Sequence, residues 1–202
     1  MFEVLIASFN VKKRQELEML LDGKNKIKIM NFNDLDITPP IIVEDGKTFR
    51  QNAVKKALTA SRFFEGLVLG DDSGLSVEAL HGKPGVRSAR FARKNATDAE
   101  NNSKLLKLLD SVPQKNRKAE FICHIALAKK GILLGSFEGV VKGEISFENK
   151  GQSGFGYDPL FIPKGYQETF AEMGAEQKNR ISHRAIALKQ VKNAIREHIK
   201  KT

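Results

Sequence analysis

The sequence predicts a mixed β-sheet flanked by helices, in a protein of the α/β or α+β class. Apolar strand-like runs alternate with helical patterns in the amino-terminal half, and a β-rich hairpin follows in the carboxyl-terminal half. A third observation is length, because 202 residues are enough for one well-buried domain, which we place at 1–202.

The amino-terminal half is expected to alternate strands with helices. Leucines at helical spacing predict a helix over residues 11–22. Thr48 and Gln51 have the spacing of a capping box, so a second helix should begin at residue 48 and end near residue 64. Apolar runs predict strands at residues 2–7, 27–32 and 67–70.

The carboxyl-terminal half is expected to contain a hairpin between two helices. Thr97 and Glu100 form another capping-box pattern, which opens a helix that ends near residue 109. The two β-rich segments meet near Lys130-Gly131, as in a hairpin. The expected elements are strands at 119–129, 132–146 and 160–162 and a final helix at 183–200.

The composition is that of an ordinary soluble protein, with 41% hydrophobic and 29% charged residues. No apolar run is long enough to span a bilayer, and the first residues lack the basic region of a secretory signal. The single cysteine, Cys123, excludes an internal disulfide and a cysteine-only zinc site. We therefore expect a cytoplasmic enzyme.

The charge balance favours an anionic partner. Lys and Arg number 34 against 24 Asp and Glu, which gives a formal net charge of +10. The charge alone does not distinguish nucleic acid, a membrane surface and a small phosphate compound, and many of the lysines lie on expected helix surfaces.

Two adjacent acids, Asp71 and Asp72, follow the apolar run Leu67–Leu69, and we place them at the end of a short strand, before Ser73. Acids at such a position, with a small hydroxyl beside them, can hold a hard cation near a phosphate. A cluster of glycines and basic residues follows at 82–90. Together they favour a nucleotide or another polyphosphate as substrate, although the acidic pair alone is more typical of a polar turn.

The segment from Ser8 to Lys13 joins the first expected strand to the first expected helix. Backbone N–H groups at a helix start can bind phosphate oxygens, the Asn10 amide can donate, and Lys13 adds a positive charge. The alternative is an Asn10 N-cap followed by a surface lysine.

A second group of polar residues surrounds the expected helix that begins at residue 48. Glu44 precedes Asp45-Gly46, whose turn would direct the Glu44 carboxylate inward. Asn52 and Lys56 are four residues apart and share one helix face. That face is either part of a site or simply exposed to solvent.

Two further segments carry candidate ligand contacts. The glycines of Gly154-Phe155-Gly156-Tyr157-Asp158 allow close approach of the backbone to a ligand, and either aromatic ring can stack on a base. The segment from Lys178 to Arg184 offers cationic and imidazole donors for carbonyl and phosphate oxygens. A surface turn and a basic helix start capped by Ser182 are the alternatives.

Taken in order, these motifs resemble those of the inosine triphosphate pyrophosphatases, also called XTP/dITP diphosphatases. The chain carries SxNxxK, FxxNAxxKA, DDSGLxVxALxGxPGVxSARFA, GxxGFGYDPxF and KNxISHR, which extend from Ser8 to Arg184. The resemblance implies an elongated mixed sheet with helices, two lobes with an active-site cleft between them, and a homodimer. It also implies Mg²⁺-dependent hydrolysis of ITP, dITP or XTP to the monophosphate and pyrophosphate.

The resemblance also implies roles for individual residues. Glu44 and Asp72 correspond to metal ligands, and Asp72 also to the proton acceptor. The implied contacts to the nucleoside triphosphate are Ser8, Asn10, Lys13, Asn52, Lys56, Ser73, Phe155, Gly156, Tyr157, Asp158, Lys178, His183 and Arg184. Two positions depart from the family pattern, because Gln51 and Gln177 replace common acids, and loss of the first acid would weaken a metal site or shift its burden to Glu44 and Asp71.

The chemistry that follows is attack of water on the α-phosphorus with pyrophosphate leaving. The sequence leaves open how Asp71 and Asp72 divide metal binding and proton transfer. Donors such as His183, Arg184 or backbone N–H groups would favour the 6-oxo group of hypoxanthine over the amino group of adenine. The alternatives are a related pyrophosphatase for pyrimidine or modified nucleotides, and a nucleic-acid-binding protein.

Overall fold

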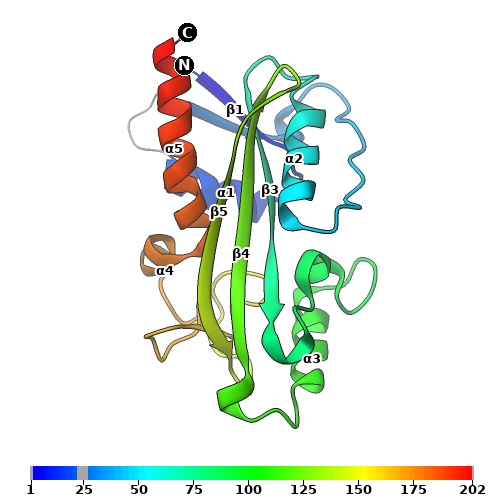
Figure 1. The fold of residues 1–202 in the computed structure, drawn as a ribbon, viewed down its shortest axis with the longest axis vertical. Coiled ribbons are helices and arrows are strands. Elements are labelled where there is room, and N and C mark those ends of the chain that lie inside the picture. Colours follow the sequence, from blue (N-terminus) through cyan, green and yellow to red (C-terminus); the bar gives the residue numbers. More distant parts are fainter. Residues whose placement is uncertain (1, 22–26, 202) are drawn as a thin grey trace. The chain divides into compact units, whose positions relative to one another are not determined.

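The computed structural model describes residues 2–21 and 27–201, whose strands form a six-stranded mixed sheet (Figure 1). The strand order is β2-β1-β3-β4-β5-β6. β1 pairs in parallel with β2 and with β3, whereas β5 and β6 are antiparallel. The strands are β1 (Phe2–Ile6), β2 (Ile27–Asn31), β3 (Leu67–Val77), β4 (Lys118–Lys129), β5 (Ile132–Ile145) and β6 (Phe161–Pro163). The predicted mixed sheet of an α/β protein is confirmed.

The helices begin at the capping signals that the sequence contains. Thr48 and Thr97 each accept a hydrogen bond from the backbone N–H three residues later, and the side chains of Gln51 and Glu100 complete both capping boxes. None of the described helices is long and apolar enough to cross a bilayer. The helices are α1 (Val11–Leu21), α2 (Phe49–Ala60), α3 (Asp98–Leu108), α4 (Ala175–Ile181) and α5 (His183–Lys201).

Two expectations about element boundaries are wrong. The strand predicted at 67–70 continues to Val77, so Asp71 and Asp72 lie inside β3 and not at its end. α2 ends at Ala60, where Ser61 caps it, and not near residue 64. Helix α4 at Ala175–Ile181 lies in a segment for which the sequence predicted no element. The predicted end of α1 at residue 22 lies outside the described residues.

The chain forms two compact units. The first contains residues 1–72, 123–139 and 184–202, and the second contains residues 73–122 and 140–183. The predicted hairpin between β4 and β5 is confirmed, and its two linking residues, Lys130 and Gly131, both have positive φ angles, as a tight turn between twisted strands requires.

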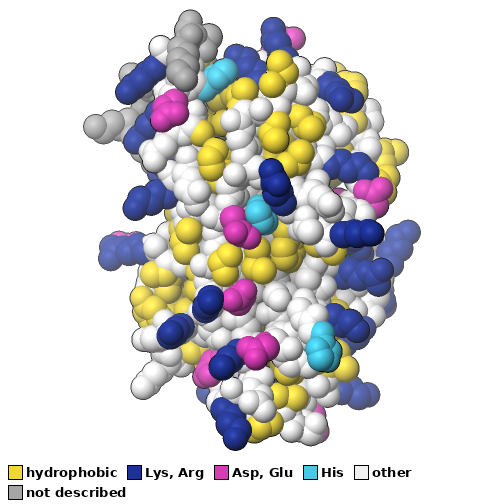
Figure 2. All heavy atoms as spheres, in the orientation of Figure 1, with side chains coloured by type: hydrophobic (Ala, Val, Ile, Leu, Met, Phe, Trp, Pro, Cys, Tyr) yellow, Lys and Arg dark blue, Asp and Glu magenta, His cyan; other side chains and the backbone are white. Residues whose placement is uncertain are grey.

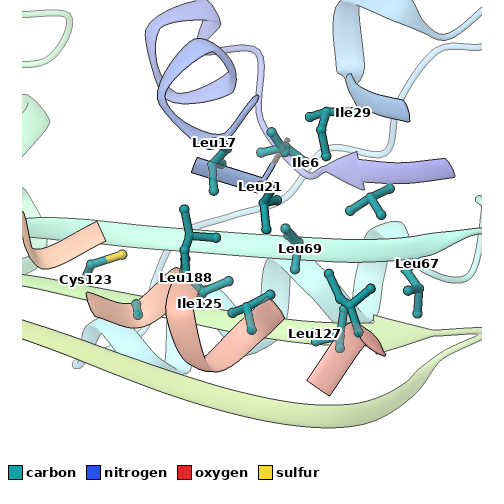
Figure 3. Close-up of a cluster of buried hydrophobic side chains, with 14 residues drawn as sticks. Ile6, Leu17, Leu21, Ile29, Leu67, Leu69, Cys123, Ile125, Leu127 and Leu188 are labelled. Atoms are coloured by element: carbon teal, nitrogen blue, oxygen red, sulfur yellow. The ribbon is translucent and has the colours of Figure 1, made fainter. Parts of the chain in front are cut away.

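The first unit covers its part of the sheet with helices on both faces. Odd-numbered residues of β3, such as Leu67 and Leu69, share a core with Leu17 of α1 and Leu188 of α5. Figure 3 shows side chains from these helices and the strands gathered in this core. Val68 points to the other face and belongs to a separate cluster, because successive side chains of a strand alternate between faces.

Helix α2 lies unusually close to that second face. Ala53 and Ala57 of α2 pack with Ala126 and Ala128 of β4, so small side chains form this contact between helix and strand. At Gly70 of β3 even a methyl group does not fit, because a Cβ there would lie 2.1 Å from the carbonyl oxygen of Ala53. The small residues therefore set the distance between α2 and β3.

The second unit has an aromatic core. Phe121, Phe161 and Phe170 contact one another, with ring centroids 4.7 to 5.9 Å apart. Beside this core, the buried guanidinium of Arg117 donates to the backbone carbonyls of Ile145, Leu109 and Ser146 at 2.6 to 2.8 Å. The hydrogen bonds to carbonyl groups satisfy a charge that would otherwise be costly to bury.

Replacing Gly70 with alanine tests the close packing of α2. We expect Gly70→Ala to lower the free energy of unfolding by about 2 kcal/mol or more, because the added methyl group displaces α2 or strains β3. Chemical denaturation measures this change. Gly174→Ala is the control, since a Cβ at Gly174 meets no atom within 4 Å, and an equal loss in both variants would contradict the packing argument.

Candidate active site

Asp71 and Asp72 point to opposite faces of β3, and each face supplies different partners. Asp71 shares the face of Leu67 and Leu69, where α1 and α5 pack, and Asp72 shares the face covered by α2. The sequence does not show which of these two acids binds metal and which transfers a proton. Their alternation along the strand places them in separate environments.

Asp71 is a buried carboxylate held by two cations. Its Oδ2 accepts a hydrogen bond from Arg184 Nε at 3.0 Å, and its Oδ1 accepts one from Lys13 Nζ. Burial alone would raise the pKa of Asp71, but Arg184 and Lys13 outweigh it and hold the pKa well below its usual value. Asp71 therefore stays ionised and is committed to these two partners.

Glu16 completes this charged group from α1. Its carboxylate pairs with Arg184 Nη1, so the buried guanidinium lies between two acids. Glu16 is not among the residues predicted from the sequence, although its position three residues after Lys13 places both on one face of α1. Burial opposes the charge of Arg184, but Asp71 and Glu16 raise its pKa, and the side chain remains a cation.

Asp72 has a different environment on the α2 face. Its Oδ2 accepts from Asn52 Nδ2 and its Oδ1 from Lys56 Nζ, both at 3.0 Å. Burial raises the pKa of Asp72, and the attraction of Lys56 and Lys13 only partly offsets this. Asp72 is therefore more ready to accept a proton than Asp71 on the opposite face.

The ammonium group of Lys56 contacts two carboxylates and one backbone carbonyl. Its Nζ lies 2.9 Å from Glu44 Oε2, 3.0 Å from Asp72 Oδ1 and 3.0 Å from the carbonyl oxygen of Asp71. Burial opposes its charged form, but Asp72 and Glu44 raise the pKa of Lys56. Two carboxylates thus converge on one cationic group, and the Glu44 side chain is still 38% exposed.

Asn52 fixes both Asp72 and the loop that carries Glu44. Its Oδ1 accepts from the backbone N–H of Gly46 at 2.8 Å while its Nδ2 donates to Asp72. A Cβ on Gly46 would lie 2.5 Å from Asn52 Oδ1, so glycine is required for this contact. Gln51 is exposed, and its Oε1 accepts from the N–H groups of Lys47 and Thr48, which makes it a helix cap.

The segment from Ser8 to Lys13 is a capped helix start. Asn10 Oδ1 accepts from the backbone N–H of Lys13 at 3.0 Å, as an N-cap does, and Ser8 Oγ accepts from Asn10 N–H. The Lys13 ammonium turns inward to Asp71 and is not a solvated surface group. Both the capping role and the inward lysine are therefore present in this segment.

The second unit holds the glycine-rich loop. Asp158 is 2% exposed, and its Oδ2 accepts from Lys178 Nζ at 2.7 Å and from the backbone N–H of Phe155 at 2.8 Å. Lys178 Nζ also lies 5.2 Å from the centre of the Phe155 ring. α4 positions this lysine, so the helix absent from our sequence prediction brings Lys178 to the loop.

Two predicted contact residues belong to the core of the second unit. Tyr157 is 4% exposed, and its hydroxyl donates to the carbonyl oxygen of Ser88 at 2.9 Å, so its ring does not offer a face for stacking on a base. His183 stacks on Phe121 with ring centroids 4.7 Å apart. Ser73, directly after Asp72 in β3, is half-buried.

The predicted residues thus form two groups, one in each unit. The first unit brings together Lys13, Glu44, Asn52, Lys56, Asp71, Asp72 and Arg184. The second unit brings together Phe155, Gly156, Asp158 and Lys178. Among the described residues, no set of three or more His, Cys, Asp or Glu side chains is arranged to hold a metal ion.

The chain is similar to known proteins over nearly its whole length. Residues 4–194 match the model of the Ham1 family. A dITP/XTP pyrophosphatase of Desulforamulus reducens is 47% identical over 190 residues, which cover 93% of this chain and 92% of that protein. Another of that name, from Geobacter sulfurreducens, is 44% identical over 195 residues, 96% of each protein.

Solved structures of Ham1 proteins are also similar to this chain over nearly its whole length. The structure of a HAM1 protein from Coxiella burnetii matches with a TM-score of 0.85 and 40% identity, covering 98% of this chain and 100% of that one. The Staphylococcus aureus Ham1 protein matches with a TM-score of 0.83 and 34% identity, covering 97% and 99%.

Substitution of the two neighbouring acids should separate their roles in stability. We expect Asp71→Asn to lower the free energy of unfolding by about 3 kcal/mol or more, because Lys13 and Arg184 lose the carboxylate that compensates their charge. Asp72→Asn should cost less, because Lys56 keeps Glu44 and a backbone carbonyl as partners. Denaturant unfolding of both variants measures the difference, and equal losses would contradict the assignment.

Proposed function

This chain belongs to the Ham1 family, and on that premise we propose that it hydrolyses dITP, XTP and ITP to the monophosphate and pyrophosphate. The observation that carries the proposal is the convergence of Asp72 and Glu44 on Lys56. Carboxylates that share a buried cation, with Lys13 nearby, form a group suited to a metal-bound polyphosphate. The names of the relatives support the choice of substrate.

The cofactor that we propose is Mg²⁺, held by Glu44 and Asp72. Mg²⁺ commonly takes one or two protein carboxylates and completes its shell with phosphate oxygens and water. The two acids fit such an ion, because both already accept from one cationic group and Glu44 remains half-exposed. When bound, Mg²⁺ supplies compensation for negative charge on the leaving pyrophosphate.

Proton transfer is assigned to Asp72 in this proposal. Asp71 is committed to Arg184 and Lys13, and its low pKa makes it a poor proton acceptor. Burial raises the pKa of Asp72 when no metal is bound, whereas Mg²⁺ bound directly to this carboxylate would lower it, so Asp72 would either orient the attacking water or take its proton through the oxygen that the ion leaves free. Asn52 donates to the Oδ2 atom of Asp72 and so orients the carboxylate.

The two lysines of the first unit supply fixed positive charge for the phosphates. Lys13 and Lys56 both donate to the carbonyl oxygen of Asp71, at 3.4 and 3.0 Å. Since each is also paired with an acid, neither is free to turn toward solvent, and their charges are in place before substrate binds. Preorganised charge of this kind stabilises the charge that develops in phosphoryl transfer.

Base selection is assigned to a side-chain donor and an aromatic ring. Two backbone N–H groups of the glycine-rich loop are already used, since Phe155 donates to Asp158 and Gly156 donates to Asp98. Arg184 is held between Asp71 and Glu16, which leaves His183, among the donors that we expected, to favour a 6-oxo group. The half-buried Phe155 ring is the surface for stacking, in place of Tyr157.

The positive net charge does not require nucleic acid as a partner. Figure 2 shows Lys and Arg side chains spread over the face in view, several of them beside acidic side chains. Of the surface ion pairs in the described residues, one joins Lys142 Nζ and Glu120 Oε1, which are 3.7 Å apart. We propose further that the enzyme acts as a homodimer in the cytoplasm, which the family resemblance supports.

A panel of nucleoside triphosphates tests the proposed function. With Mg²⁺, we expect pyrophosphate and monophosphate from ITP, dITP and XTP, much slower release from ATP, GTP and pyrimidine triphosphates, and none after chelation of the metal. Orthophosphate as the product would contradict the proposal. Preference for pyrimidine or modified nucleotides would favour a related pyrophosphatase, and salt-sensitive binding of DNA or RNA without hydrolysis would favour the nucleic-acid alternative.

The Asp72→Asn variant tests the proposed proton acceptor. We expect kcat for ITP to fall by about a hundredfold or more, the usual range for loss of a general base, while the melting temperature changes little. Asp45→Asn is the matched control, since Asp45 lies beside Glu44 but forms an exposed ion pair with Lys55. Near-normal turnover in Asp72→Asn would remove Asp72 from the mechanism.

A further inference from the structure

We infer that Asp98 and Asn102 of α3 are positioning residues that fix the peptide groups of Gly156 and thereby set the base preference of the enzyme. The inference rests on the proposed function, because it concerns which base the glycine-rich loop accepts. Asp98 and Asn102 lie outside the sequence motifs and outside both groups of candidate site residues.

Both backbone groups of Gly156 are bound by α3. The N–H of Gly156 donates to Asp98 Oδ2 at 2.8 Å, and its carbonyl oxygen accepts from Asn102 Nδ2 at 3.0 Å. Asp98 and Asn102 are four residues apart and therefore lie on one face of α3. Gly156 cannot rotate about its backbone without breaking at least one of these hydrogen bonds.

The rest of the loop is tied to other parts of the second unit. Phe155 N–H and Lys178 both donate to Asp158, and the Tyr157 hydroxyl donates to the carbonyl of Ser88. Gly156, with a φ angle of +64°, is the residue of this run whose backbone α3 holds. Since Gly156 directly follows Phe155, α3 fixes the peptide that orients the Phe155 ring.

The buried Asn102 amide lowers the stability of the fold, so packing alone does not explain an asparagine at this position. It is 4% exposed, and within residues 2–21 and 27–201 its Oδ1 has no hydrogen-bond partner. A buried acceptor without a partner lowers stability, so leucine of similar size would be the better residue for packing. The amide is explained by its Nδ2, which holds Gly156.

The neighbouring Asn101 provides a matched control. It is also buried in α3, but its Oδ1 accepts from Ala92 N–H at 2.8 Å and its Nδ2 donates to the carbonyl of Ala89 at 3.3 Å. These contacts lead to residues 89–92 and not to the glycine-rich loop. Asn101→Leu therefore removes a buried amide from the same helix without releasing Gly156.

Loss of either contact should relax base discrimination. Without Asp98, the Gly156 N–H is no longer held, so the peptide between Phe155 and Gly156 can rotate and the Phe155 ring gains freedom to tilt. Without Asn102, the Gly156 carbonyl loses its donor. We expect Asp98→Ala and Asn102→Leu each to lower the ratio of kcat/KM for ITP to that for ATP by about fivefold to tenfold, the usual effect of one hydrogen bond. Asp98→Asn keeps an acceptor oxygen and should restore most of the ratio.

The experiment measures kcat/KM for ITP and ATP, inhibition by pyrophosphate, and thermal unfolding for the wild type and these variants. In Asp98→Ala and Asn102→Leu the ITP to ATP ratio should fall while pyrophosphate inhibition stays unchanged, because the proposed phosphate contacts are elsewhere. Asn101→Leu should change stability without changing the ratio. Asp98 is exposed, so its variant is expected to fold even if Asn102→Leu does not.

The outcomes separate this inference from the proposed function. A wild-type protein that releases no pyrophosphate from ITP overturns the proposed function and the inference with it. An active wild type whose ratio is unaffected by Asp98→Ala overturns the inference alone. The inference is also overturned if Asn101→Leu lowers the ratio as much as the other variants do, because the effect then reflects general damage to α3.

Discussion

The alternation of side chains along β3 is the constraint on which the site depends. Because Asp71 and Asp72 are neighbours in a strand, they face opposite sides of the sheet and cannot share one metal or one proton. Each therefore needs its own partners, and the helices on the two faces supply them. α1 and α5 provide Lys13 and Arg184, and α2 provides Asn52 and Lys56 with their different chemistry.

The cost of burying charge explains why small residues lie between α2 and the sheet. A buried carboxylate is tolerated when a cation lies within hydrogen-bonding distance, and that distance is set by the separation of helix and strand. Gly70 lets α2 approach until Lys56 is 3.0 Å from Asp72. The glycine before the two acids is therefore part of the electrostatic arrangement as well as of the packing.

The sequence predicts most elements of the fold, since capping boxes, apolar periodicity and hairpin signals are local. It fails at Asp71-Asp72, where residues with weak β-propensity suggest the end of a strand, although tertiary pairing continues β3 to Val77. That error hides the separation of the two acids. Motif resemblance finds the polar residues, but it cannot show that Tyr157 is packed in the core or that Gln51 is a helix cap.

The polar groups of the two units differ in the kind of recognition that the proposed function would require of each. Triphosphates all carry the same charge, so an ion-pair group such as that of the first unit, in its proposed role, would not distinguish one base from another. Discrimination between an oxo and an amino group depends on the direction of hydrogen bonds and on unpaired polar groups. Hydrogen bonds keep their direction only if the backbone that carries them is fixed. In the second unit, the glycines allow the loop its conformation, but they do not make its backbone rigid. The stiffness comes from neighbouring elements, with α4 holding Asp158 and α3 holding Gly156.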